Sequence, residues 1–238
     1  MSVLSINNIN LHYGQLHALN NISLDLNEGE ILFVTGPNGA GKSSLIKAIA
    51  GLQPISSGQI SLHGQAIACW SPEKVARSGF SMVPEGRHVF SALTIEENLL
   101  VGAGLNGKTS SVDALARVYD SFPILRERRH SGAGLLSGGQ QQMLVIARAL
   151  MTESPFIAID EPSLGLAPKI IDQVYDLLLK IKQERHLTLL IVEQNSSRAV
   201  EIGGRMLLLR NGQIQMQGDA RELGSSSALN DAYFGYGE

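Results

Sequence analysis

The first part of the chain alternates apolar and polar residues over two segments, residues 4–11 and 19–26. A period of two is typical of strands that bury one face. His12, Tyr13 and Gly14 separate the two segments, and the glycine favours a turn there. The pattern therefore predicts two antiparallel strands joined by a turn region.

Further along, short uninterrupted apolar runs replace the alternation, as is typical of parallel strands that are buried on both faces. Between the second and third runs, residues 168–183 place apolar side chains on one helical stripe, with proline at the first helical position. This alternation of strand and helix predicts an α/β core with a parallel sheet. The apolar runs cover residues 31–34, 156–159, 187–192 and 206–209.

Between residues 85 and 155 the strand pattern disappears and helical patterns follow one another, separated by glycine-rich breaks. We therefore predict a single domain over residues 1–238, in which residues 1–84 and 156–238 form the α/β core and residues 85–155 form an inserted helical subdomain. Residues 224–227 predict a flexible spacer before a short final helix. The helical patterns of the insertion cover residues 95–101, 112–122 and 141–151.

The composition is that of a globular protein, with 44% hydrophobic and 17% charged residues. A net charge of -3 gives no basic footprint for phosphate backbones, so we expect no nucleic acid partner. Cys69 is the one cysteine, which excludes an intramolecular disulfide. Residues 1–10 lack the pattern of a secretory signal, and prolines and glycines interrupt the long uncharged window 48–72, so we expect neither secretion nor a membrane span.

Glycine makes up 25 of 238 residues, which exceeds the average content of about 7% in proteins. Some of these glycines form a motif. Residues 36–43 read GPNGAGKS between a predicted strand and a helical pattern at 43–50. This is the pattern of a phosphate loop, in which backbone N–H groups and a helix N-terminus face a phosphate. Lys42 would neutralise the outer phosphates and Ser43 would ligate Mg²⁺; a glycine turn with an incidental lysine is the alternative. The residues expected to bind a nucleoside triphosphate are Gly36, Asn38, Gly39, Gly41, Lys42, Ser43 and Ser44.

Two acidic residues, Asp160 and Glu161, directly follow the apolar run 156–159. An acid at the end of a buried strand beside a phosphate loop can hold Mg²⁺, and a second acid can orient and deprotonate an attacking water. We assign Asp160 to the metal and Glu161 to the water, with a merely solvated strand end as the alternative. Because phosphoryl transfer needs little else from the protein, hydrolysis is the expected reaction.

A second glycine-containing element opens the helical pattern that runs to Met151. Ser137 is suited to cap the N-terminus of this helix, which is a second helix end able to face an anion. One such element is enough for one nucleotide, so the second suggests a triphosphate presented by another subunit. We call this element the signature segment; its expected nucleotide contacts are Ser137, Gly138, Gly139 and Gln140.

These three motifs, in this order and over nearly the whole chain, resemble those of the ATP-binding cassette ATPases. The resemblance implies a head-to-tail dimer that closes over two ATP molecules, each held between the phosphate loop of one subunit and the signature segment of the other. In this family an aromatic ring stacks on adenine, and Tyr13 lies in the matching place; a core tyrosine at a strand end is the alternative. Residues 163–166 resemble the loop through which the subunits communicate, although a plain glycine turn has the same local sequence.

Two departures from the general pattern are Glu85, where most members have glutamine, and Gln194, where most have histidine. Gln194 could donate a hydrogen bond to the γ-phosphate but cannot hold a proton as histidine does. Glu85 could ligate Mg²⁺ or reach the attacking water, although its charge repels phosphate, and a solvated loop residue is the alternative. We therefore include both among the candidate catalytic residues, and Glu85 also among the candidate metal ligands.

Four segments narrow the resemblance to the shorter of the two ATPases in bacterial branched-chain amino acid importers, while similar cassettes import urea and short amides. The resemblance implies a second ATPase subunit, two membrane permeases and a periplasmic or extracellular substrate-binding protein. It implies a peripheral location on the cytoplasmic face of the inner membrane, and a groove at residues 85–101 for a permease helix; ordinary helix packing is the alternative for that groove. The four segments are residues 83–87, 93–99, 163–168 and 192–195.

Two other classes of phosphate-loop protein remain as alternatives to a transport ATPase. A soluble cassette acting as a nucleotide-gated clamp on ribosomes or DNA usually has two fused cassettes or a long coiled coil, and neither pattern is present in the sequence. A phosphate-loop kinase would use Asp160 or Glu161 to activate a hydroxyl acceptor, but it would leave the signature segment without a role.

Overall fold

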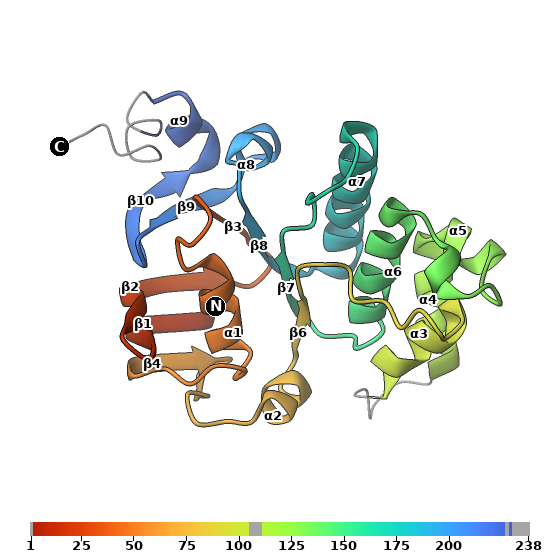
Figure 1. The fold of residues 1–238 in the computed structure, drawn as a ribbon, viewed down its shortest axis with the longest axis horizontal. Helices are drawn as coiled ribbons and strands as arrows, with labels where there is room; N and C mark the ends of the chain where they lie inside the picture. The colour runs from red at the N-terminus through yellow and green to blue at the C-terminus, as the bar shows by residue number, and fades with distance from the viewer. Residues whose placement is uncertain (1, 105–110, 227–228, 230–238) are drawn as a thin grey trace. The chain divides into compact units, whose positions relative to one another are not determined.

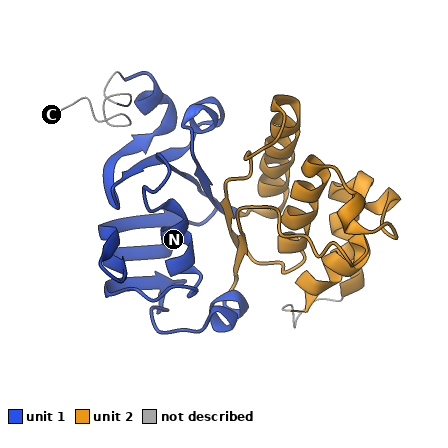
Figure 2. Ribbon diagram, in the orientation of Figure 1, with its two compact units in different colours: residues 1–78, 188–238 blue, residues 79–187 orange. Residues whose placement is uncertain are grey.

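The computed structural model describes residues 2–104, 111–226 and 229. The chain divides into two compact units, drawn in blue and orange in Figure 2. The first unit comprises Met1–Ser78 with Thr188–Glu238, and the second is Gly79–Leu187. The domain limits expected from the sequence are drawn at other residues and stay a prediction.

The first unit contains an antiparallel sheet built on the two strands expected at the start of the chain (Figure 1). Burial alternates along most of both strands, as expected, but each strand has one step of three residues between buried positions, from Ile6 to Ile9 and from Leu19 to Ile22, where the pairing register shifts. His12 and Tyr13 belong to the first strand rather than to the turn, which is confined to Gly14 and Gln15; the expected turn region was too long. In order across the sheet, the strands are β2 (Leu16–Asn27), β1 (Ser2–Tyr13), β4 (Ser57–Leu62) and β5 (Gln65–Ala66).

The second sheet of this unit holds three of the expected buried strands. Strand β3 (Ile31–Thr35) lies in the middle and pairs in parallel with β8 (Thr188–Glu193) on one side and with β9 (Arg205–Arg210) on the other. Every residue of β8 is buried, as expected for a strand covered on both faces. The spacer expected at residues 224–227 is described as far as Ser226, and its first residue, Gly224, is the last residue of a helix. The final helix expected after the spacer lies outside the described residues, except for Leu229. The strands are β3 (Ile31–Thr35), β8 (Thr188–Glu193), β9 (Arg205–Arg210) and β10 (Gln213–Asp219), which is antiparallel to β9. The helices are α1 (Lys42–Ile49), α2 (Pro72–Arg77), α8 (Ser197–Ile202) and α9 (Ala220–Gly224).

The second unit joins two parallel strands to a group of helices (Figure 1). The helical patterns of the sequence are confirmed, and the described residues between 85 and 155 form no strand beyond one isolated bridge, Thr94 with Gly132. The strands are β6 (Phe80–Val83) and β7 (Phe156–Asp160). The helices are α3 (Ile95–Ala103), α4 (Ser111–Ser121), α5 (Pro123–Glu127), α6 (Gly138–Leu150), α7 (Pro168–Arg185) and the 3-10 turn η1 (Ala133–Leu135).

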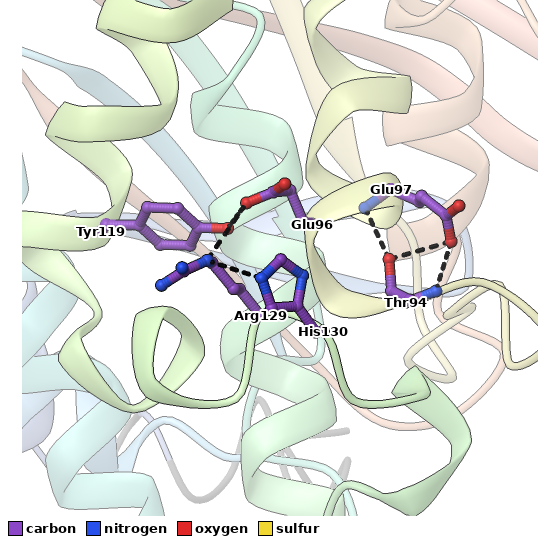
Figure 3. Close-up of polar contacts among 6 residues, drawn as sticks. All are labelled: Thr94, Glu96, Glu97, Tyr119, Arg129 and His130. Carbon is purple, nitrogen blue, oxygen red and sulfur yellow. Dashed lines mark hydrogen bonds and ion pairs between the residues drawn. The ribbon is translucent and has the colours of Figure 1, made fainter.

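A capping box starts α3, as Figure 3 shows. The Thr94 hydroxyl accepts a hydrogen bond from Glu97 N (3.2 Å), and the Glu97 carboxylate accepts one from Thr94 N (2.7 Å). The hydrogen bond from that backbone N–H holds the pKa of Glu97 below its usual value. The start of α3, which follows the loop 84–93, is therefore fixed by its own first turn.

A second polar group ties α3 to α4 and to a basic run that precedes η1, formed by Arg126, Arg128, Arg129 and His130 (Figure 3). The Tyr119 hydroxyl donates to Glu96 Oε2 at 2.8 Å, and burial, followed by this contact, raises the pKa of Tyr119 above its ordinary value. Arg129 Nε lies 3.9 Å from Glu96 Oε2 and donates to His130 Nε2 at 3.1 Å. The basic run thus takes part in the packing of the helical group.

Among the residues that the structure describes, no helix combines the length and the apolar character that a membrane span requires. Cys69 lies on the surface of the first unit, after β5.

Candidate nucleotide-binding site

The phosphate loop lies between β3 and α1, as the sequence predicts. Two of its glycines meet neighbouring backbone so closely that no side chain fits. A Cβ on Gly36 would lie 2.1 Å from the Leu209 carbonyl oxygen, and one on Gly41 would lie 2.6 Å from that of Ala18. Both glycines also have positive φ, 149° and 105°. The shape of the loop is therefore set by contacts with β9 and β2.

We expect Gly36→Ala to lower the free energy of unfolding by about 2–4 kcal/mol, because the new Cβ overlaps a backbone oxygen and the φ is unfavourable. Gly14→Ala is the matched control: Gly14 also has positive φ, 59°, but a Cβ there meets nothing within 4 Å. It should cost only about 1 kcal/mol. Urea unfolding of both variants measures the difference; equal losses would show that the contact with Leu209 is unimportant.

Lys42 opens α1 and its side chain turns back across the loop. Its Nζ donates hydrogen bonds to the carbonyl oxygens of Gly36 (2.8 Å) and Pro37 (3.2 Å), and the residue is buried. The helix begins without a side-chain cap, and the first N–H groups of a helix have no acceptor within the helix. Ser43 and Ser44 follow at this end, half-buried, whereas Asn38 and Gly39 are exposed. The Lys42 ammonium group and the N-terminus of α1 therefore lie next to the exposed backbone of Asn38 and Gly39, which is the arrangement that phosphate binding requires.

Tyr13 and Gln194 both belong to the unit that carries the phosphate loop. Tyr13, 38% exposed, pairs with Leu16 at the end of the β1–β2 hairpin, whose Ala18 touches Gly41. Gln194 follows β8, and β8 pairs with β3 so that Glu193 is opposite Thr35. Gln194 therefore stands at the same strand edge as Gly36, and the structure brings both residues to the neighbourhood of the loop.

The acidic residues lie in the second unit, at the carboxyl ends of β6 and β7. Val83 pairs with Ile159, so Glu85 and Glu161 each stand two residues beyond a matched pair of parallel strands. Asp160 is the last residue of β7 and is only 2% exposed, while Glu161 is half-buried and Glu85 is exposed. Glu161 adopts a left-handed backbone conformation, with φ 48°, which is uncommon for a residue with a side chain. The candidate metal ligand and the candidate base thus share one strand edge.

The signature segment forms a second capping box, at the start of α6. Gln140 N donates to Ser137 Oγ (3.3 Å), and Gln140 Oε1 accepts from Ser137 N (3.1 Å) and from Arg128 (3.1 Å). Gly139 allows α6 to approach α7, because a Cβ there would lie 2.4 Å from Ile170 Cγ2. The predicted cap by Ser137 is therefore present.

The oxygen donors predicted for magnesium are the Ser43 hydroxyl in the first unit and the carboxylates of Asp160 and Glu85 in the second unit. Mg²⁺ is commonly held by one or two protein oxygens together with phosphate oxygens and water, so this donor chemistry suits it. No cluster of three or more His, Cys, Asp or Glu suited to a metal is found among the described residues.

Arg87, which follows Glu85 by two residues, makes long-range contacts that its local sequence does not predict. Its guanidinium reaches the carbonyl oxygens of Leu164 and Gly165, which are 77 and 78 residues away in the chain. The local sequence shows only an arginine after a glycine, so no local signal identifies these partners.

Comparison with known proteins identifies the family of the chain. The family model described as "ABC transporter" matches residues 19–164. The chain is 39% identical to the high-affinity branched-chain amino acid transport ATP-binding protein BraG of Pseudomonas aeruginosa, over 98% of this chain and 100% of BraG. It is also 39% identical to the probable branched-chain amino acid transport ATP-binding protein LivF of Archaeoglobus fulgidus, over 90% and 91% of the two chains.

Among solved structures, MJ1267, an ATP-binding cassette of an ABC transporter, is similar in its ADP conformation. The TM-score is 0.86 at 26% identity, and 99% of each chain is covered. This similarity confirms the expected fold, an α/β phosphate-loop core with an antiparallel β-subdomain and inserted helices. Taken with the family model and the two curated relatives, it shows that the chain belongs to the ABC transporter family of ATP-binding proteins.

Proposed function

We propose that this chain is the ATP-binding and ATP-hydrolysing subunit of an importer for branched-chain or other hydrophobic amino acids. The observation that carries the proposal is the 39% identity to BraG over 98% of this chain and all of BraG, whose name describes branched-chain amino acid transport. The phosphate loop between β3 and α1 supplies the structural support for the nucleotide. The urea and short-amide importers remain alternatives that the uptake experiment below separates.

In this proposal the phosphates lie against the loop 36–43 and the start of α1. Lys42 already faces the loop with its ammonium group, so it can exchange a carbonyl contact for a phosphate oxygen. Tyr13, on the hairpin that contacts Gly41, would stack its ring on the adenine. Ser43 and Asp160 would hold Mg²⁺, which supplies positive charge against the developing charge on the phosphates.

Hydrolysis requires a base for the attacking water, and we assign this role to Glu161. Asp160 is buried and Glu161, the next residue, is half-buried, so the two consecutive acids can serve the metal and the water separately. Gln194 can donate its amide hydrogens to the γ-phosphate from the end of β8, the strand that pairs with β3 beside the phosphate loop. Glu85 stays a candidate for the metal or the water, because it follows the strand next to β7.

The same proposal includes the partners. The signature segment 137–140 would bind the triphosphate held by a second ATPase subunit, identical or not, and the closing of this dimer would drive two permease subunits. A substrate-binding protein would act indirectly, through the permeases. We place the chain at the cytoplasmic face of a bacterial inner membrane as a peripheral subunit, with residues 1–84 and 156–238 as the ATP-binding core and residues 85–155 as the helical subdomain.

The proposal is tested by uptake into proteoliposomes that contain this chain with the permeases and binding protein encoded by neighbouring genes. We expect ATP-dependent uptake of labelled leucine, and loss of uptake when this chain is omitted. Uptake of urea without leucine would contradict the amino acid assignment but keep the transport role. Co-sedimentation with ribosomes and absence of any uptake would instead favour the clamp.

A further inference from the structure

Arg87 stands where three functional segments of the second unit meet. Its Nη2 donates hydrogen bonds to the carbonyl oxygens of Leu164 (3.2 Å) and Gly165 (2.9 Å), in the loop that follows Glu161. The same guanidinium lies against the signature segment, because a Cβ on Gly138 would be 2.5 Å from its Nη1. One side chain, two residues beyond Glu85, thus touches both the loop after Glu161 and the start of α6.

The loop that Arg87 holds contains the candidate base at its first position. Leu164 N donates to the Glu161 carbonyl oxygen (3.2 Å), so the turn from Glu161 to Leu164 is closed by a backbone hydrogen bond. Glu161 and Gly165 both have left-handed backbones, with φ 48° and 66°. A side-chain-bearing residue keeps such a conformation only where its surroundings impose it. The two hydrogen bonds from Arg87 are contacts that can impose this turn.

Arg87 itself extends from a loop that is held at several points. Arg148, on α6, donates to the His88 carbonyl oxygen at 2.8 Å. The buried Asn98 side chain, on α3, accepts from Phe90 N at 2.9 Å and donates to Phe90 O at 3.0 Å. These hydrogen bonds fix the backbone on the C-terminal side of Arg87, so the position of its guanidinium group is restricted and it can stabilise the loop that it contacts.

We propose that Arg87 is a positioning residue for Glu161. Its hydrogen bonds to the carbonyl oxygens of Leu164 and Gly165 stabilise the turn 161–165 in one conformation. In that conformation the Glu161 carboxylate is oriented toward the attacking water. The inference rests on the proposed ATPase function and on Glu161 as its base. Arg87 would act through the loop and not on the nucleotide, so its loss should change turnover more than ATP binding.

The test compares Arg87→Gln, Arg87→Lys and a control, Arg126→Gln, in the full chain, alone and in the transporter used for uptake. Arg126 is an exposed arginine of the same unit, paired only loosely with Asp120 at 3.8 Å. We expect Arg87→Gln to lower kcat by about 10- to 100-fold with the KM for ATP changed less than about twofold. Arg87→Lys, which keeps a cation able to reach one carbonyl, should recover part of the rate, and Arg126→Gln should match the wild type.

A double-mutant cycle with Glu161→Gln separates positioning from general damage. If Arg87 acts through Glu161, adding Arg87→Gln to Glu161→Gln causes no further loss in single-turnover phosphate release. Hydrogen exchange in residues 161–166 should also speed up in Arg87→Gln, while that of β7 stays unchanged.

The inference is overturned if Arg87→Gln keeps the wild-type kcat, or if it lowers the rate by the same factor with and without Glu161. In both cases the proposed ATPase function stands, because the wild type still hydrolyses ATP. A wild-type transporter that releases no phosphate from ATP and Mg²⁺ would overturn the proposed function and this inference together.

Discussion

Glu161→Gln is expected to bind ATP normally and to hydrolyse it about 10²- to 10⁴-fold more slowly than the wild type. Glutamine has nearly the shape of glutamate but cannot accept the proton of the attacking water. Binding without turnover should therefore leave the ATP-bound dimer to accumulate. Phosphate release gives the rate, and size-exclusion chromatography with ATP and Mg²⁺ should show a species of twice the chain mass.

Glu184→Gln provides the control for this change. Glu184 is a half-exposed glutamate on α7 that pairs with Lys180 at 3.9 Å, and it lies far along the helix from the loop after β7. It should hydrolyse ATP at the wild-type rate. Unchanged phosphate release in Glu161→Gln would remove Glu161 from the role of base and direct attention to Glu85, at the neighbouring strand end.

Lys42→Ala should weaken ATP binding by about 100-fold or more. The substitution removes an ammonium group that stands at the phosphate loop, and charge-assisted hydrogen bonds to phosphate are among the strongest in proteins. It also removes the donor to the Gly36 and Pro37 carbonyls, so the loop loses two internal contacts. Titration with ATP followed by calorimetry measures the dissociation constant directly.

Lys47→Ala is the matched control, because Lys47 is an exposed lysine in the last turn of the same helix. It should bind ATP as the wild type does, which would separate the loss of a local contact from a general loss of positive charge. An affinity of Lys42→Ala within about threefold of the wild type would contradict the role of Lys42 in phosphate binding.

The long elements were predictable because several local signals agree on them. The helix expected at 168–183 is α7, Pro168–Arg185, which starts at proline and buries Val174, Leu178 and Ile181 on one face. It ends at His186, in a left-handed conformation that glycine more often provides, so the sequence does not mark that end. Strand β6 was missed because it has only four residues, and β10 because its alternating polar side chains leave it only partly buried.

The features of the candidate site also fall into those that local sequence predicts and those that it does not. The phosphate loop, the acids after β7 and the cap at Ser137 are each specified by neighbours in sequence, so local patterns suffice for them. The environment of Gly138 depends on Arg87, and that of Gly139 depends on Ile170. Such pairings are decided by tertiary packing between distant segments, which no spacing rule in a single sequence encodes.

The exposed thiol of Cys69, the one cysteine of the chain, makes site-specific labelling straightforward. A maleimide dye should attach to one known position on the first unit without replacement of any native cysteine. A second cysteine placed on an exposed residue of α4 would add a position on the other unit. Energy transfer between the two dyes would then show whether the distance between the labelled positions changes as ATP is bound and hydrolysed.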